Sequence, residues 1–358
     1  MTYRGSRRHQ STISTSTTTP TTTTTTTTDT DRSAEEAASW LLSRFEGKTL
    51  TARQVLDGNQ LQKLSLTLGR RSLHPGAEPD ITTRAPPAGT PIPPGYHLAY
   101  FTPSGVEAEL GADGSDGAFN APPPFTRRMW AGGRMRWAEA EGEGAGAALR
   151  VGDEVEERTT LRSAVAKVGR DGAAMVLVGA VKEFWGPGGL AVVDERSWIF
   201  RPKATSASPA AELRLRDAVV TGPSTVKDIL SQEGSYPRRQ FRWSPTGLFR
   251  FSALTFNGHK IHYDPTWTAS VEGHPACVVH GPLNLINMLD YWRDHCGVGG
   301  LRVKEINYRA VAPLYAGDTY EISAEGPTAV EGTDGNLGWD VVVTKDGRTH
   351  MKGHILGM

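Results

Sequence analysis

Apolar and polar residues alternate in six stretches of this 358-residue chain, arranged as two groups of three. The first group follows a Gly-Asp pair at 152–153 and reads EVEERTTL, AAMVLVGAVKEFW and AVVDERSWIFRP. The second group follows a Gly-Asp pair at 317–318 and reads TYEISAEG, LGWDVVVTKDG and THMKGHILGM. Alternation with a period of two is typical of half-buried strands. Because the three stretches recur in the same order, the sequence indicates an internal repeat of one antiparallel unit.

Helical periodicity occurs between the two groups and before them. Apolar residues from Leu285 to Trp292 recur at helical spacing, and Pro282 suits the first turn, where its missing N–H is not needed. The segment SAEEAASWLLSRFEG opens with Ser33 and has acids in its first turn, which is typical of a capped helix. We expect a helix against a sheet in the second half and the same plan in the first half. The run RFSALTF, residues 250–256, is predicted to be a strand.

Residues 1–33 are expected to lie outside the fold. Arg4, Arg7 and Arg8 come early, Ser and Thr dominate, and no acid precedes Asp29. This pattern is typical of a mitochondrial presequence and also of a plain disordered tail. Both interpretations stay open, and the first places the protein in mitochondria.

The overall composition excludes several classes of protein. Thirty-nine basic and 39 acidic residues give zero net charge, which argues against nucleic acid as a partner. No apolar run approaches the roughly eighteen residues of a membrane span. The two cysteines, Cys277 and Cys296, form no CxxC motif, so a reducing compartment is the simplest expectation.

Five of the ten histidines fall between residues 259 and 295. A metal site is disfavoured, because no carboxylate or cysteine pattern completes one around His259 and His262. Acid–base chemistry is the alternative: His262 can move a proton, and Asn257 can position water through its amide. Gly281 opens the helix that follows, whose free N–H groups can hold a carbonyl that becomes enolate-like. These parts suit the addition of water across an activated double bond.

The segment FNGHKIHYD, followed by VVHGPL, resembles the hydratase/dehydratase branch of the hotdog superfamily, the MaoC-like enoyl-thioester hydratases. Their motif is G-D-x-N-P-I-H, followed by a Gly at the start of the central helix. By this resemblance His262 is the final His of the motif and Gly281 is the helix-start Gly. Asn257 stands at the Asp position, and His259 at the inner Asn. RRMWAGGRMRW and RAVAPLYAGDTYE further resemble a two-hotdog subgroup, which includes mitochondrial 3-hydroxyacyl-thioester dehydratases and mesaconyl-CoA hydratases; the likeness spans residues 44–358.

One motif position departs from the family. An amide cannot accept a proton, so with Asn257 in place of Asp, His262 would do the acid–base work alone while Asn257 orients water. Asp264, two residues after His262, is a candidate substitute carboxylate. Without the resemblance, a capping or turn role for Asn257 is favoured. His259 and His280 are expected to be structural or to orient His262.

The first half is expected to carry no catalytic pair. No histidine occurs between His97 and His259, so the strands of this half offer no imidazole. The resemblance implies that this half completes the sheet and shapes an acyl tunnel. Arg127 and Arg128 are expected at a packed or solvated edge.

The resemblance implies an α+β double hotdog, with two antiparallel sheets that each wrap a long central helix. Residues 34–203 would form the first hotdog, 204–240 a linker, and 241–358 the second hotdog with the active site. Such a chain is expected either as a monomer that mimics the usual dimer of hotdogs or as a homodimer.

The implied activity is that of a hydro-lyase. It would hydrate 2-enoyl thioesters or dehydrate 3-hydroxyacyl thioesters reversibly, in mitochondrial fatty acid synthesis, without cofactor or metal. Coenzyme A or acyl carrier protein would carry the acyl group, and Arg302, Lys304 and Arg309 could meet its phosphates. The alternatives are a mesaconyl-CoA hydratase, a non-catalytic acyl-thioester binding protein and a thioesterase.

Overall fold

The computed structural model describes residues 32–73, 80–138, 148–202, 220–231, 234–330, 332 and 335–358. The expected presequence or tail lies outside these ranges up to residue 31. The helices, with η for 3-10 helices, are α1 (Ala34–Phe45), α2 (Gly58–Thr67), η1 (Tyr96–Ala99), η2 (Glu107–Glu109), α4 (Pro245–Leu254), η3 (Lys260–His262), α5 (Pro265–Ser270), α6 (Gly281–His295) and η4 (Val298–Gly300). The strands are β1 (Thr49–Val55), β2 (Arg127–Trp137), β3 (Glu154–Val168), β4 (Ala174–Gly186), β5 (Gly189–Arg201), β6 (Thr225–Ile229), β7 (Arg238–Arg242), β8 (Val303–Ala310), β9 (Thr319–Ala329), β10 (Leu337–Lys345) and β11 (Arg348–Gly357).

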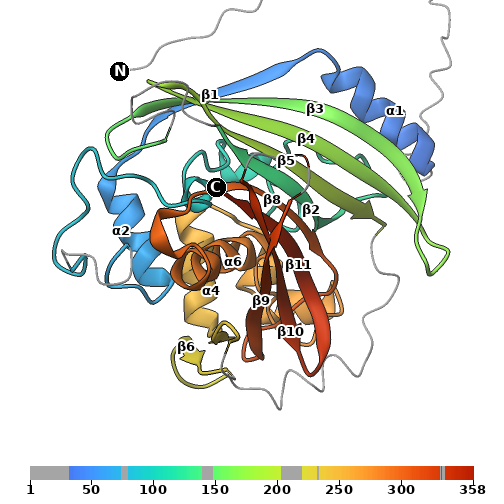
Figure 1. Cartoon of the computed structure of the whole chain (residues 1–358). Coiled ribbons are helices and arrows are strands. Elements are labelled where there is room, and N and C mark those ends of the chain that lie inside the picture. Colours follow the sequence, from blue (N-terminus) through green and yellow to red (C-terminus); the bar gives the residue numbers. More distant parts are fainter. Residues whose placement is uncertain are drawn as a thin grey trace, which may run out of the picture.

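Within the described ranges the strands form one continuous antiparallel sheet of eleven strands. Their order is β1-β3-β4-β5-β2-β8-β11-β10-β9-β7-β6. The two halves meet edge to edge where β2 pairs with β8, with Gly133 opposite Tyr308. Figure 1 shows the first-half strands β3–β5 crossing above α6 and the second-half strands β8–β11 lying beside it. All six alternating stretches predicted from the sequence are therefore confirmed as strands.

The order of the strands reads the same from either side of the β2–β8 pair, apart from the extra edge strand β6. Local geometry repeats in the same way. Asp153 Oδ2 accepts a hydrogen bond from Arg150 N at 2.8 Å, and Asp318 Oδ2 accepts one from Tyr315 N at 2.8 Å. The glycine before each aspartate has a positive φ, 96° and 87°, which a residue without Cβ adopts at little cost. The internal repeat read from the sequence is thus a structural repeat.

The expectation of two sheets, each around a long helix, is met only in part. The sheet is continuous, and among the described residues only the second half contains a long central helix, α6. In the first half, η1 occupies the corresponding place in the chain, between α2 and β2, and ends after one turn. Gly95 (φ 84°) precedes that turn, and Tyr100 directly after it is extended, so no second turn forms.

Burial explains why α6 holds its place. Every residue of this helix from Leu283 to Trp292 is buried, and the helix packs into a core shared by both halves. A second apolar cluster joins α1 to the inner face of β3, β4 and β5, through residues such as Leu41, Val178 and Phe200. Ser33 caps α1 in a capping box with Glu36, as the sequence predicts. The inner face of the first-half strands therefore carries two separate apolar clusters.

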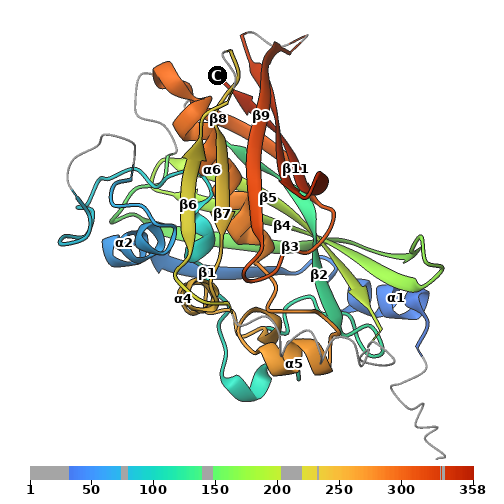
Figure 2. The same cartoon turned by 90° about the horizontal axis from the view of Figure 1, so that it is seen from below.

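One local prediction is wrong. Residues 250–256 were expected to form a strand, but residues 245–254 form α4, with Ser244 as its N-cap and Pro245 in its first turn. Phe249 and Phe251 imitate a period of two, yet Phe249 is 58% exposed while Phe251 is buried. The expected linker at 204–240 contains β6 and most of β7, which pair with each other and through β7 with β9 (Figure 2). Their short polar sequences, TVKDI and RRQFR, give little hydrophobic signal.

Candidate active site

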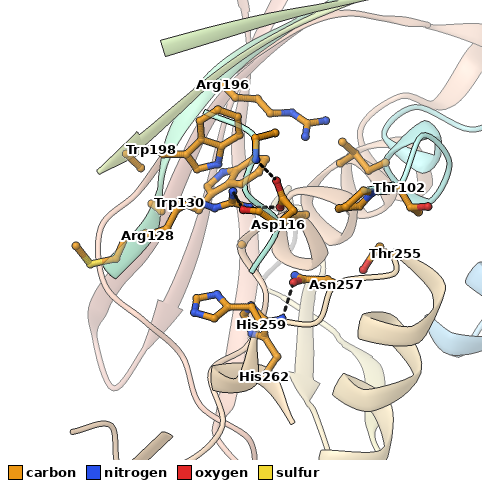
Figure 3. Close-up of a pocket in the computed structure, with 18 of the residues that line it drawn as sticks. Thr102, Asp116, Arg128, Trp130, Arg196, Trp198, Thr255, Asn257, His259 and His262 are labelled. Carbon is orange, nitrogen blue, oxygen red and sulfur yellow. Dashed lines mark hydrogen bonds and ion pairs between the residues drawn. The ribbon is translucent and has the colours of Figure 1, made fainter. Parts of the chain in front are cut away.

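A cavity of about 600 Å³ lies between the two halves. The second half contributes the loop from Asn257 to His262 and the start of α6, and the first half contributes β1, the start of β2, and β3–β5. Of the six predicted site residues, Asn257, His259, His262 and Gly281 line this cavity. Figure 3 shows the first three below Arg128, Asp116 and Trp130. The cavity therefore combines the sequence motif with residues of the other half.

His262 is held so that one ring nitrogen is left to accept a proton. Its Nδ1 lies 2.7 Å from the carbonyl oxygen of Val278, and since a carbonyl only accepts, Nδ1 carries the hydrogen. The neutral ring then has a bare Nε2. Burial, followed by the nearby His259, lowers the pKa of His262 to about 3. The side chain is thus a neutral imidazole at physiological pH.

His280 fixes the plane of the His262 ring. The two rings stack with their centres 3.7 Å apart and an angle of 17° between their planes. His280 is fully buried, and its Nε2 lies 2.9 Å from Ser252 Oγ on α4. Burial, and then His262, lower the pKa of His280 well below its ordinary value. His280 does not line the cavity, so its position fits the orienting role expected from the sequence.

Asn257 and His259 form a tight turn before His262. Asn257 Oδ1 accepts a hydrogen bond from His259 N at 3.0 Å, which leaves the amide Nδ2 as the donor of this side chain. His259 Nε2 lies 3.4 Å from Asp113 Oδ2 of the first half. Burial, with Arg128 next, lowers the pKa of His259 to about 3. Within the described ranges no group of three or more His, Cys, Asp or Glu is placed to hold a metal ion.

Gly281 begins α6 at the wall of the cavity. A Cβ at this position would lie 3.0 Å from Trp130 Cγ, so the indole of β2 packs directly on the helix backbone. The free N–H groups and positive dipole end of this 15-residue helix therefore face the cavity beside an aromatic wall.

Asp264 is not positioned as a substitute carboxylate. Its Oδ1 accepts a hydrogen bond from Trp267 N at 2.8 Å, and the residue caps α5. It is absent from the wall of the cavity. Its local capping bond explains why an Asp stands two residues after His262.

The sequence reasoning missed the polar residues that the first half brings to the site. Arg128 lines the cavity and forms an ion pair with Asp116 at 2.8 Å, instead of lying at a solvated edge. Asp116 belongs to the segment GADGSDGAFNAPPPF, whose Gly and Asp content indicated only a loop. No spacing rule links these residues to a motif more than a hundred positions later.

A second polar group lies on the inner face of the first-half strands. Lys182 pairs with Glu157 at 2.7 Å, and Arg196 pairs with Asp194 at 2.6 Å. The side chains of Lys182 and Arg196 are each 15% exposed, whereas those of Glu157 and Asp194 are 10% and 0% exposed. Lys182, Glu157 and Arg196 line the cavity, whereas Asp194 does not.

The fold and site together define a double hotdog with acid–base groups at the start of its central helix. Residues 95–316 match the family model described as hydroxyacyl-thioester dehydratase type 2. A mesaconyl-C(4)-CoA hydratase of Chloroflexus aurantiacus is 32% identical over 257 residues, which cover 68% of this chain and 82% of that protein. The mitochondrial hydroxyacyl-thioester dehydratase type 2 of Schizosaccharomyces pombe is 24% identical over 251 residues, which cover 65% of this chain and 77% of that protein.

Solved structures agree on the fold. A MaoC-like dehydratase of Phytophthora capsici superposes with a TM-score of 0.55 at 14% identity, covering 89% of this chain and 98% of that one. A Mycobacterium tuberculosis protein described as a double hotdog superposes with a TM-score of 0.51 at 16% identity, covering 87% of this chain and 96% of that one. The chain belongs to the hydroxyacyl-thioester dehydratase type 2 family, which confirms the resemblance read from FNGHKIHYD and VVHGPL.

Proposed function

We propose that the chain catalyses the reversible hydration of a 2-enoyl thioester, with His262 as the residue that moves the proton. The bond from His262 Nδ1 to the Val278 carbonyl carries this proposal, because it presents a bare Nε2 at the wall that also holds the start of α6. The family and the two named relatives support it, since each name is that of a hydratase or a dehydratase of thioesters.

The reaction follows from this arrangement. In the hydration direction, His262 Nε2 takes a proton from water while the water oxygen bonds to the β carbon of the enoyl group. The electron pair of the double bond moves to the α carbon and the carbonyl oxygen, and the N–H groups at the start of α6 stabilise the resulting enolate. The imidazolium then returns the proton to the α carbon. Asn257 Nδ2 holds the oxygen of the water.

The test is the loss of enoyl-thioester absorbance from crotonyl-CoA, mesaconyl-C4-CoA or a long-chain 2-enoyl-CoA near neutral pH. We expect His262→Ala to lower kcat at least 100-fold, within the range of general acid–base catalysis. His354→Ala, in a half-exposed histidine of β11 bonded to Asp340, is the matched control and should keep wild-type activity. A thiol reagent would detect the free thiol that a thioesterase releases. Tight thioester binding without any turnover would favour a non-catalytic binding protein.

A second candidate is an enoyl thioester whose acyl group ends in a carboxylate. Lys182 and Arg196 favour it, because both line the cavity, whereas Asp194, the partner of Arg196, does not. The Arg196 guanidinium carbon is 5.4 Å from the centre of the Trp130 ring, and Trp130 also touches Gly281. A short acyl chain along Trp130 would thus reach from the helix start to these cations. Burying the end of a fatty acyl chain against them would be unfavourable.

This candidate predicts a preference among substrates. Mesaconyl-C4-CoA should exceed a long-chain 2-enoyl-CoA in kcat/KM by at least tenfold. Arg196→Met should reduce kcat/KM for the carboxylate-bearing substrate by about tenfold or more and leave crotonyl-CoA nearly unchanged, since a lost charge-assisted hydrogen bond is worth about 1.5–3 kcal/mol. Preference for the long chain would instead support the role in fatty acid synthesis.

The acyl carrier and the compartment belong to the same proposal. Arg309 is exposed on β8 directly before Ala310, where the lining of the cavity begins, whereas Arg302 precedes the other end of the strand. We expect Arg309→Ala to raise KM for a coenzyme A thioester and Arg302→Ala to leave it unchanged. Mitochondrial placement is supported by the Arg-bearing, acid-poor start of the chain, and import of residues 1–33 fused to a fluorescent protein tests it. No helix in the described ranges is long and apolar enough to span a membrane.

A further inference from the structure

A loop of the first half is built into the motif of the second half. The backbone N of Lys260 donates to the carbonyl oxygen of Asp113 at 2.8 Å, and its Nζ donates to that of Ala112 at 2.9 Å. Gly114 approaches Gly258 so closely that a Cβ on Gly114 would lie 2.1 Å from the Gly258 carbonyl oxygen. These contacts fix residues 112–116 against the residues between Asn257 and His262.

Asp116 is the last residue of this segment, and it lines the cavity. Among the described residues the carboxylates on the cavity wall are Asp116 and Glu157, and Glu157 is occupied by Lys182 and Thr159. Asp116 Oδ2 pairs with Arg128 at 2.8 Å and Oδ1 accepts a hydrogen bond from Ala118 N at 3.2 Å, and each oxygen of a carboxylate can accept a further hydrogen bond. Figure 3 shows Asp116 and Arg128 on the side of the cavity that faces Asn257 and His259. The negative charge of Asp116 acts on His259, whose pKa it raises against the stronger effects of burial and Arg128.

From this placement we infer that Asp116 supplies, from the other half of the chain, the catalytic carboxylate that the motif lacks at Asn257. This inference rests on the proposed hydration reaction. Asp116 accepts a hydrogen bond from the second hydrogen of the attacking water, while His262 Nε2 accepts the first. Its charge also stabilises the imidazolium that forms when His262 takes the proton.

The chemistry needs no change in the protonation of Asp116. Water loses one proton to His262, its oxygen bonds to the β carbon, and the same proton returns to the α carbon; Asp116 stays ionised throughout. The groups that face Asp116 are Arg128 on β2, Lys182 on β4 and His259 on the motif loop. Burial tends to raise the pKa of Asp116, but Arg128, the backbone N–H of Ala118 and Lys182 together outweigh it, so the pKa lies below its ordinary value. This carboxylate is therefore charged wherever the protein is folded at neutral pH.

The experiment compares Asp116→Asn with the double variant Asp116→Asn/Asn257→Asp, which restores a carboxylate at the family position. On the most active thioester, we expect Asp116→Asn to lower kcat about 100-fold with KM within threefold, in line with loss of a group that orients and polarises the water. The double variant should regain at least tenfold over Asp116→Asn. Glu109→Gln, an exposed carboxylate just before the same loop, should behave as wild type. Thermal melts check folding, and Asp116→Glu replaces Asp116→Asn if that variant does not fold, with an expected loss of at least tenfold.

The outcomes separate this inference from the proposed function. An active wild type with an Asp116→Asn variant within threefold of it would overturn the inference alone. A large loss that the second substitution does not restore would overturn it too, because Asp116 would then serve only to hold Arg128. A wild type inactive on every thioester would instead count against the hydration reaction itself.

Discussion

The indole of Trp130 lies against the backbone of Gly281, so that a residue of the first half covers the start of the central helix in the second half. The same indole packs on the ring of Tyr308 across the junction of the two halves, with the ring centres 6.2 Å apart and an angle of 19° between the ring planes. Only a residue without a side chain permits this approach. The geometry of the helix start therefore depends on the junction between the halves.

Gly281→Ala should disturb both stability and activity. The added Cβ would lie 3.0–3.2 Å from three atoms of Trp130, so the indole must move by a few tenths of an ångström. Overpacking of this kind costs about 1–3 kcal/mol. We expect a loss of that size in the free energy of unfolding from urea titrations, a change in tryptophan fluorescence, and a fall in kcat/KM. An unchanged unfolding midpoint would show that the indole yields freely.

Phe256→Gly should stabilise the protein. Phe256 ends α4 with a positive φ of 48°, and its side chain is 64% exposed, so little packing is lost. Gly69 follows α2 in the first half in the same conformation, with a φ of 77°. The hydrogen bonds after the two residues also correspond, since Arg70 N donates to Ser65 O and Asn257 N donates to Ser252 O. A non-glycine residue in this conformation costs about 1–2 kcal/mol. Chemical denaturation should show a gain of about 1 kcal/mol.

The matched substitution in the first half should have the opposite sign. Gly69→Ala places a Cβ where the nearest atom is 3.9 Å away, so strain of the backbone is its main effect. We expect a loss of about 1 kcal/mol. If Phe256→Gly and Gly69→Ala changed the free energy of unfolding in the same direction, the proposed correspondence between the two helix ends would be contradicted.

Arg70→Met should destabilise the junction between the halves. Arg70 forms two hydrogen bonds to Asp294 near the end of α6, at 2.6 and 2.9 Å, and the side chains are 14% and 4% exposed. Removing one partner of a buried ion pair typically costs about 3–5 kcal/mol when the other charge is left unpaired; because Asp294 keeps Arg239 at 2.7 Å, we expect a loss of about 2–3 kcal/mol. Arg53→Met is the control, because Arg53 is 69% exposed and its pair with Glu156 should be worth less than about 1 kcal/mol. Similar losses of unfolding free energy in the two variants would argue against a stabilising buried ion pair at Arg70.

Stability should fall as the pH drops from about 6.5 toward 4. Burial is the largest cause that lowers the pKa of five histidines: to about 4 for His97 and His274, to about 3 for His259 and His262, and far below normal for His280. The unfolded chain, with histidine pKa values near 6.5, therefore binds more protons in this window, so acid favours unfolding by up to about 1.4 kcal/mol per pH unit for each histidine. Carboxylates with lowered pKa values begin to contribute below about pH 5, so the part of the window above pH 5 reports the histidines.

The measurement is the free energy of unfolding at several pH values between 7.5 and 4.5. His274→Gln should reduce the slope, because it removes one of the five groups. A flat profile would show that the five histidines are not held neutral.

The sequence predicted the repeated strands and the helix α6 because each carries its own periodicity, in runs such as that from Leu285 to Trp292. It predicted the neighbourhood of His262 because those residues are close in the chain. It failed at residues 250–256, where Phe251 and the Phe249 that precedes the run lie two positions apart although only Phe251 is buried. It could not place Asp116, because that position depends on contacts between segments more than a hundred residues apart.

The one-turn helix η1 leaves the first half without the helix that would fill its sheet. Between its two apolar clusters the inner face of β3–β5 meets the cavity rather than side chains. An acyl group bound there would fill space that core side chains do not occupy. Part of its binding free energy would therefore stabilise the folded state of the first half. Hydrogen exchange in β3–β5 should then report whether the cavity is occupied, although the histidine that moves the proton lies in the other half.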